Sequence, residues 1–235
     1  MKIIDIKTTI VNAEMRNWVF VKIITDQDVY GWGEATVEWK TRAVVGAIED
    51  LKPLLIGKDP RDIKQNFQIM TKHGFWKLGV IGMSAISGIE HALWDILGKS
   101  LNTPVWQLLG GKVRNKIKIY THLGMGDMKA VYRDTMEKNK LNEHAAALIE
   151  KGYKAFKVVF IPFTHHTNSI KNLEKVNQLM SSLRDKVGDD IDIMVDFHGR
   201  CASGISAIQY VKELQPYKPF FIEEPILPGD NKTLL

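Results

Sequence analysis

The second half of the chain alternates short apolar segments with longer amphipathic ones, and this alternation constrains the fold more than any other feature. Strand-like segments recur roughly every 35 residues, at 117–120, 155–160, 191–195 and 220–222. The intervals carry helical patterns, at about 128–151, 169–187 and 203–214. Strands separated by helical sequence of this length pair in parallel through crossover helices. Residues 116–235 therefore predict a parallel α/β unit.

Residues 1–115 have a different order, with strands first and helices after. Residues 2–36 predict a β-meander of three antiparallel strands. Helical spacing follows over about 43–54 and 82–98, and Asp59-Pro60 is typical of a helix start, with Asp59 as N-cap. Pro104 predicts a further short helix that ends at Gly110-Gly111. This half predicts a separate α+β unit.

Composition excludes several classes of protein. The chain has 235 residues, 45% of them hydrophobic and 25% charged, which is ordinary for a globular protein. Cys201 is the single cysteine, so an intrachain disulfide is impossible and a reducing, cytoplasmic setting is expected. The net charge of +5 comes from scattered residues, which argues against nucleic-acid binding. No signal pattern or apolar run of about 20 residues predicts a membrane segment.

Polar side chains gather where the predicted parallel strands end. Asp196 and His198 follow the strand at 191–195, and Glu223-Glu224 follows the strand at 220–222. Because ligands of parallel α/β folds bind beyond the carboxyl ends of the strands, we expect these side chains on one rim. Carboxylate oxygens are the donors that Mg²⁺ prefers. Strand alternation would also place His198 on the same face as Asp196, in a suitable arrangement for acid–base chemistry.

Each of these residues also has a plain structural interpretation. A carboxylate after a strand often caps the next helix, and an acidic pair is often only surface charge. His198 could be a hydrogen-bonded loop residue, and Lys157, at the end of the second strand, could be exposed or ion-paired. Their common location favours a site more than any single residue does.

Motifs along the whole chain resemble one protein family. They are 31–35 (GWGEA), 40–45 (KTRAVV), 54–60 (LLIGKDP), 84–96 (SAISGIEHALWDI), 108–111 (LLGG), 195–200 (VDFHGR) and 221–225 (FIEEP). In this order they resemble the mandelate racemase and muconate lactonizing branch of the enolase superfamily, and within it the galactonate dehydratases and related acid-sugar dehydratases.

The resemblance implies an α+β capping domain at 1–115 and a modified (β/α) barrel from 116 onward. It implies Mg²⁺ bound by Asp196 and Glu223, with His198 as an acid/base residue. The implied reaction removes water from a galactonate-type sugar acid through an ene-diolate and gives a 2-keto-3-deoxy acid. Residues 14–18 and the region of Trp39 would then help to select the substrate.

Two departures from the family pattern shape these expectations. Lys157 is followed by Val158 and Val159, so the Lys-x-Lys pair of the racemases is missing. The sequence ends at Leu235, so 116–235 would hold only the first four barrel strands, without the family's third metal carboxylate and second histidine. We therefore expect weak metal binding, little turnover, and a homo-oligomer that covers the open strand edges. The alternatives are an inactive remnant acting as a binding module, and a racemase or cycloisomerase of the same superfamily.

Overall fold

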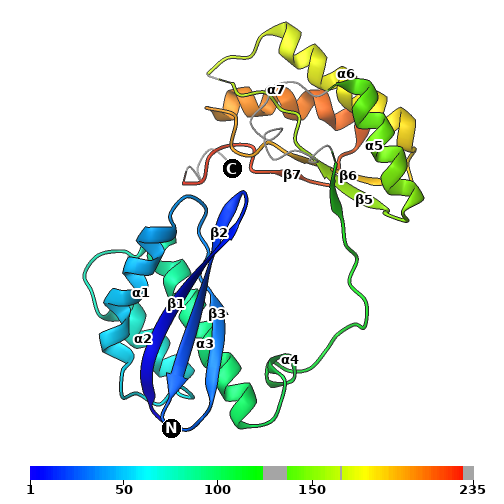
Figure 1. The fold of residues 1–235 in the computed structure, drawn as a ribbon. Helices are drawn as coiled ribbons and strands as arrows, with labels where there is room; N and C mark the ends of the chain where they lie inside the picture. The colour runs from blue at the N-terminus through cyan, green and yellow to red at the C-terminus, as the bar shows by residue number, and fades with distance from the viewer. Residues whose placement is uncertain (124–136, 165, 230–235) are drawn as a thin grey trace. The chain divides into compact units, whose positions relative to one another are not determined.

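The computed structural model describes residues 1–123, 137–164 and 166–229. The chain divides into two compact units, Met1–Asn115 and Lys116–Leu235. Figure 1 shows an antiparallel sheet with its helices in the first unit and a parallel sheet with its helices in the second.

The first unit is a three-stranded meander covered by helices. Its strands pair antiparallel in the order β1-β2-β3. The elements are β1 Ile3–Ala13, β2 Arg16–Thr25, β3 Tyr30–Glu34, α1 Thr41–Leu55, α2 Ile63–Lys72, α3 Gly79–Ser100 and α4 Val105–Leu108. Alternate residues of the sheet enter one apolar core with α1, α2 and α3, among them Val19, Val21 and Ile23.

Two glycines of β3 allow α3 to approach the sheet closely. A Cβ at Gly31 would lie 2.0 Å from the Ala92 carbonyl oxygen, and a Cβ at Gly33 would lie 1.9 Å from that of Gly88. No side chain fits at either position. Asp95 of α3 then accepts a hydrogen bond from the Trp32 backbone N–H at 2.9 Å. Close packing thus explains the two glycines of the GWGEA motif, and a hydrogen bond explains Asp95 in the motif at 84–96.

Helix α3 is long, with 22 residues, and largely apolar. Among the described residues it is the one helix that could cross a membrane by length and composition alone. Its buried positions, including Ile86, Ile89 and Leu93, are part of the core of the first unit. Burial in the core of the first unit therefore explains why α3 is long and apolar.

The second unit is a four-stranded parallel sheet in the order β4-β5-β6-β7. Its elements are β4 Thr121–Leu123, α5 Lys138–Glu150, β5 Ala155–Val158, α6 Ile170–Val187, β6 Asp192–Asp196, α7 Gly204–Leu214, the 3₁₀-helix η2 Gln215–Tyr217, and β7 Ile222–Glu223. Phe156, Val158, Ile193 and Val195 pack with apolar residues of the three α-helices in one core. The opposite face of the sheet is therefore left for other residues.

Two helix starts in this unit follow from local sequence. The Ser169 side chain accepts a hydrogen bond from the backbone N–H of Asn172 and caps α6. Ser203 and Ser206 form a capping box at the start of α7. Because α7 begins soon after β6, this cap bounds the loop that follows Asp196.

The predicted fold class, an α+β capping unit followed by a parallel β/α unit, is confirmed. Asp59 as a helix N-cap is wrong, since α2 begins at Ile63 after Asp62. Asp59 instead accepts hydrogen bonds from the backbone and guanidinium of Arg61, which closes a turn before the helix. The predicted strand at 117–120 lies at Thr121–Leu123. The helix predicted over 128–151 is α5 from Lys138, and 128–136 lies outside the described residues.

Candidate active site

The register of the parallel sheet brings four polar residues onto one face. His122 pairs with Lys157, and Asp196 pairs with Glu223. Lys157 also pairs with Met194, which lies two residues before Asp196 and so on the same face of β6. The apolar partners of these residues, such as Phe156 and Val195, enter the helix-covered core. The polar residues therefore lie on the face away from α5, α6 and α7.

The Lys157 ammonium lies between the two carboxylates. Its Nζ is 3.0 Å from Asp196 Oδ2, and 2.8 and 2.7 Å from Glu223 Oε1 and Oε2. Lys157 is only 6% exposed and Asp196 only 3%. Burial opposes protonation of the ammonium, but hydrogen bonds to Glu223 and Asp196 outweigh it and raise the Lys157 pKa. Lys157 is thus a buried, ion-paired cation and not an exposed lysine.

Asp196 also organises the turn that follows β6. Its Oδ1 accepts the backbone N–H of His198 at 2.7 Å, so the carboxylate bonds to the backbone two residues on. His198 has a left-handed φ of 53°, which is uncommon for a residue other than glycine. The argument that strand alternation places His198 beside Asp196 is wrong, because β6 ends at Asp196. The carboxylate and the turn bring the two residues together instead.

The structure distinguishes the two glutamates of the acidic pair. Glu223 is in β7, and its carboxylate reaches Lys157. Glu224 has left the strand with φ of 44° and is exposed. Its carbonyl oxygen accepts the Gly199 N–H at 2.9 Å, which ties the turn after β6 to the end of β7.

His122 was missed in the sequence analysis. The predicted first strand ended at residue 120, so His122 fell in the following loop, whereas the structure places it in β4 beside Lys157. Burial lowers its pKa first and the charge of Lys157 lowers it further, against the opposing charges of Asp196 and Glu223. Although the residue keeps contact with solvent, its imidazole is disposed to stay neutral near pH 7.

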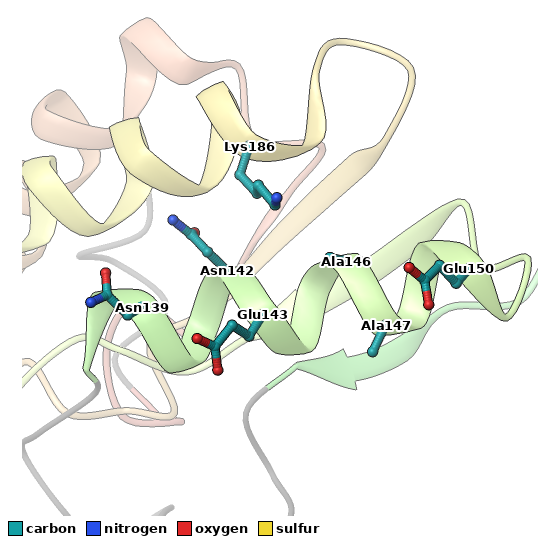
Figure 2. A pocket seen from close by; sticks show the side chains of 7 residues that line it. All are labelled: Asn139, Asn142, Glu143, Ala146, Ala147, Glu150 and Lys186. Carbon is teal, nitrogen blue, oxygen red and sulfur yellow. The ribbon is translucent and has the colours of Figure 1, made fainter.

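Two hollows of the surface are lined by other residues. In Figure 2, residues of α5 and Lys186 of α6 line a hollow of about 460 Å³. Asn142 of α5 bonds to Ser182 of α6 at 2.7 Å beside it, and we interpret it as a groove between packed helices. In the first unit, a hollow of about 650 Å³ is lined by Asn17, Trp39 and neighbouring residues of 40–43, with Ile10. It includes the Trp39 region expected to help in substrate selection.

Comparison with known proteins gives two family matches in chain order. Residues 2–110 match the N-terminal domain of mandelate racemase and muconate lactonizing enzyme, and residues 140–234 match the enolase C-terminal domain-like family. The chain belongs to the enolase superfamily. Within it, the sequence is 41% identical over 210 residues to D-galactonate dehydratase from Klebsiella pneumoniae (strain 342). That alignment covers 89% of this chain and 52% of the relative, so the chain spans about half the length of that curated relative.

Solved structures of the enolase superfamily agree with this assignment. A member from Salmonella Typhimurium matches with a TM-score of 0.91 and 30% identity, over 99% of this chain and 63% of that one. An enolase from Pantoea ananatis, solved with bound D-gluconate and Mg, matches with a TM-score of 0.84 and 30% identity, over 99% of this chain and 62% of that one.

The enolase-superfamily assignment implies a metal ion, and the residues present fit one in part. Asp196 and Glu223 offer hard carboxylate oxygens within 3.0 Å of a common point, the Lys157 nitrogen. Across 1–123, 137–164 and 166–229, no group of three histidine, cysteine, aspartate or glutamate side chains could hold a metal ion. The two carboxylates are therefore suitable donors for Mg²⁺ but too few, and further oxygen ligands would have to complete the site.

Proposed function

We propose that this chain takes part in the Mg²⁺-dependent dehydration of a sugar acid of the galactonate type to a 2-keto-3-deoxy acid. The observation that carries the proposal is the register pair Asp196–Glu223, which presents two carboxylates at one point of the sheet. The 41% identity to a D-galactonate dehydratase supports the substrate class. We also propose that residues 1–115 act as the capping domain of this site.

We propose Asp196 and Glu223 as the residues that hold the metal. A bound Mg²⁺ would supply positive charge that holds a substrate carboxylate and stabilises the negative charge that develops on it. The backbone N–H of His198 on Asp196 Oδ1 fixes the orientation of that carboxylate. The chain thus supplies two ligands and an anchor for one of them.

We propose that the His198 imidazole exchanges protons with the substrate. Dehydration requires a base to take the proton from the carbon beside the carboxylate and an acid to protonate the departing hydroxyl. A histidine is suited to either task near neutral pH. The backbone bond from His198 to Asp196 Oδ1 supports this role, because it fixes His198 next to a proposed metal ligand.

The absence of a second lysine favours dehydration over racemisation. Val159 stands where the resemblance places the second lysine of the racemases, and it is a buried apolar residue. The Lys157 ammonium is ion-paired to both carboxylates. Neither residue is thus a free base for a two-base racemisation.

The test is an assay for 2-keto-3-deoxy acids on a panel of sugar acids, with Mg²⁺ and with EDTA. We expect slow, Mg²⁺-dependent product formation, lost in Asp196→Asn and reduced about 10²- to 10⁴-fold in His198→Gln. Asp192→Asn, at the other end of β6, and His91→Gln, on exposed α3 surface, are matched controls that should keep activity. Product formation in EDTA, or full activity in both site variants, would refute the proposal. Deuterium uptake beside the carboxylate without keto-acid product would indicate a racemase.

A further inference from the structure

Every carboxylate oxygen of the proposed metal pair already has a hydrogen-bond donor. Lys157 Nζ contacts both oxygens of Glu223, at 2.8 and 2.7 Å, and Asp196 Oδ2 at 3.0 Å. The remaining oxygen, Asp196 Oδ1, accepts the backbone N–H of His198 at 2.7 Å. A cation that approaches three of these four oxygens therefore meets the positive charge of the Lys157 ammonium at hydrogen-bond distance.

The Lys157 ammonium also reduces the electrostatic repulsion between the two carboxylates on this face of the sheet. Asp196 and Lys157 are almost fully buried, and two carboxylates that close together repel each other strongly where water cannot screen them. A shared cation removes much of that repulsion through short, charge-assisted hydrogen bonds. Lys157 is fixed in β5 by its pairing with Met194, so its side chain is directed to this place by the fold.

We propose that Lys157 is a built-in counter-cation, which holds Asp196 and Glu223 together before a divalent cation binds and then competes with that cation for their oxygens. The inference deepens the proposed function, because it rests on Asp196 and Glu223 being the metal ligands. Lys157 would thus stabilise the metal-free fold and weaken metal binding at the same time.

Replacing Lys157 should therefore lower the stability of the metal-free protein and raise its metal affinity. This combination distinguishes a counter-cation from a residue with a purely structural role. Removing the ammonium leaves the buried Asp196 carboxylate and the half-buried Glu223 carboxylate without their shared cation, so the metal-free protein loses stability. The same change removes a positive charge beside the incoming cation and frees three carboxylate oxygens for it, so metal affinity rises. A residue that only supported the sheet would lower both quantities when replaced.

The experiment compares Lys157→Met with Lys154→Met in the same protein. Lys154 is an exposed lysine just before β5, so its variant controls for the loss of one positive charge. Thermal unfolding is followed in EDTA, and the affinity for Mn²⁺ alone is measured by calorimetric titration and electron paramagnetic resonance. We expect Lys157→Met to melt at a lower temperature in EDTA and to bind Mn²⁺ on the order of tenfold or more tightly. Lys154→Met should match the wild type in both.

Several outcomes would overturn the inference. Unchanged or weaker Mn²⁺ binding by Lys157→Met would contradict the role of Lys157 as a counter-cation. If Asp196→Asn still abolishes Mn²⁺ binding in that case, the proposed metal site remains valid. Wild-type binding that Asp196→Asn leaves unchanged would refute the metal site itself, and the inference with it. Should Lys157→Met fail to fold in EDTA, Lys157→Gln and folding in Mg²⁺ decide the question. Rescue by Mg²⁺ supports the counter-cation, and failure of both variants in Mg²⁺ contradicts it.

Discussion

Asp196 and Glu223 are register partners on the neighbouring parallel strands β6 and β7. Partners in a parallel ladder direct their side chains to the same face, and here both carboxylates contact the Lys157 ammonium. The next residue of each strand end takes no part in this contact: Phe197 is buried in the apolar core and Glu224 is exposed. The pairing therefore selects one carboxylate from each strand end.

That selection predicts different roles for adjacent glutamates. Glu223→Gln should lower dehydratase activity and Mn²⁺ affinity by about a hundredfold or more, because it removes a proposed charged metal ligand. Glu224→Gln removes the same charge from the neighbouring residue, which is exposed. It should stay within a few-fold of the wild type. Equal losses in the two variants, measured by steady-state kinetics and titration, would contradict the assignment of Glu223.

The contact between β3 and α3 predicts a large effect from one methyl group. Gly33→Ala places a Cβ on the Gly88 carbonyl oxygen, so the free energy of unfolding should fall by about 3 kcal/mol. Gly46→Ala is the control, since that position on α1 has open space around it, and the variant should gain about 1 kcal/mol from helix propensity. All six tryptophans lie within residues 1–115, so tryptophan fluorescence in denaturant reports on this unit. Equal stability of the two variants would be inconsistent with this packing.

The turn before α2 predicts a specific dependence of stability on pH. The Arg61 guanidinium, bonded to Asp59, lowers the pKa of that carboxyl to about 2. Because the folded pKa lies below the unfolded one, the stabilisation is present above about pH 4 and disappears as pH falls toward 2. The stability gap between wild type and Asp59→Asn should therefore shrink over this range, in urea unfolding at several pH values. Asp62→Asn, which removes a nearby charge from a side chain that makes no cap bond, is the control. A gap that stays constant from pH 6 to about 2 would count against the Asp59–Arg61 pair.

The sequence allowed the order of elements to be predicted because burial and periodicity dominate long segments. The meander of residues 2–36 and helices α1, α3, α6 and α7 are examples, since each has a clear apolar face. Helix starts are set by short-range bonds that spacing does not show. Asp59 precedes a proline and looks like an N-cap, yet Arg61 two residues later takes its carboxylate.

The candidate site was predicted in part, for a similar reason. Strand ends can be placed from sequence to within a few residues, which was enough to select Asp196 and Glu223 as candidates. It was not enough for His122, whose strand begins later than its apolar pattern indicates. The function of Lys157 depends on the register between β5, β6 and β7, which joins residues 39 and 66 positions apart and has no local signal.

The most direct test of the account is where a divalent cation binds. Crystals of the protein grown with Mn²⁺ should show an anomalous difference peak coordinated by Asp196 and Glu223, with the Lys157 ammonium moved off at least one of the two carboxylates. The peak should be absent in Asp196→Asn and present in Asp192→Asn. Mn²⁺ bound elsewhere, or Lys157 still bridging both carboxylates at saturating Mn²⁺, would contradict the account.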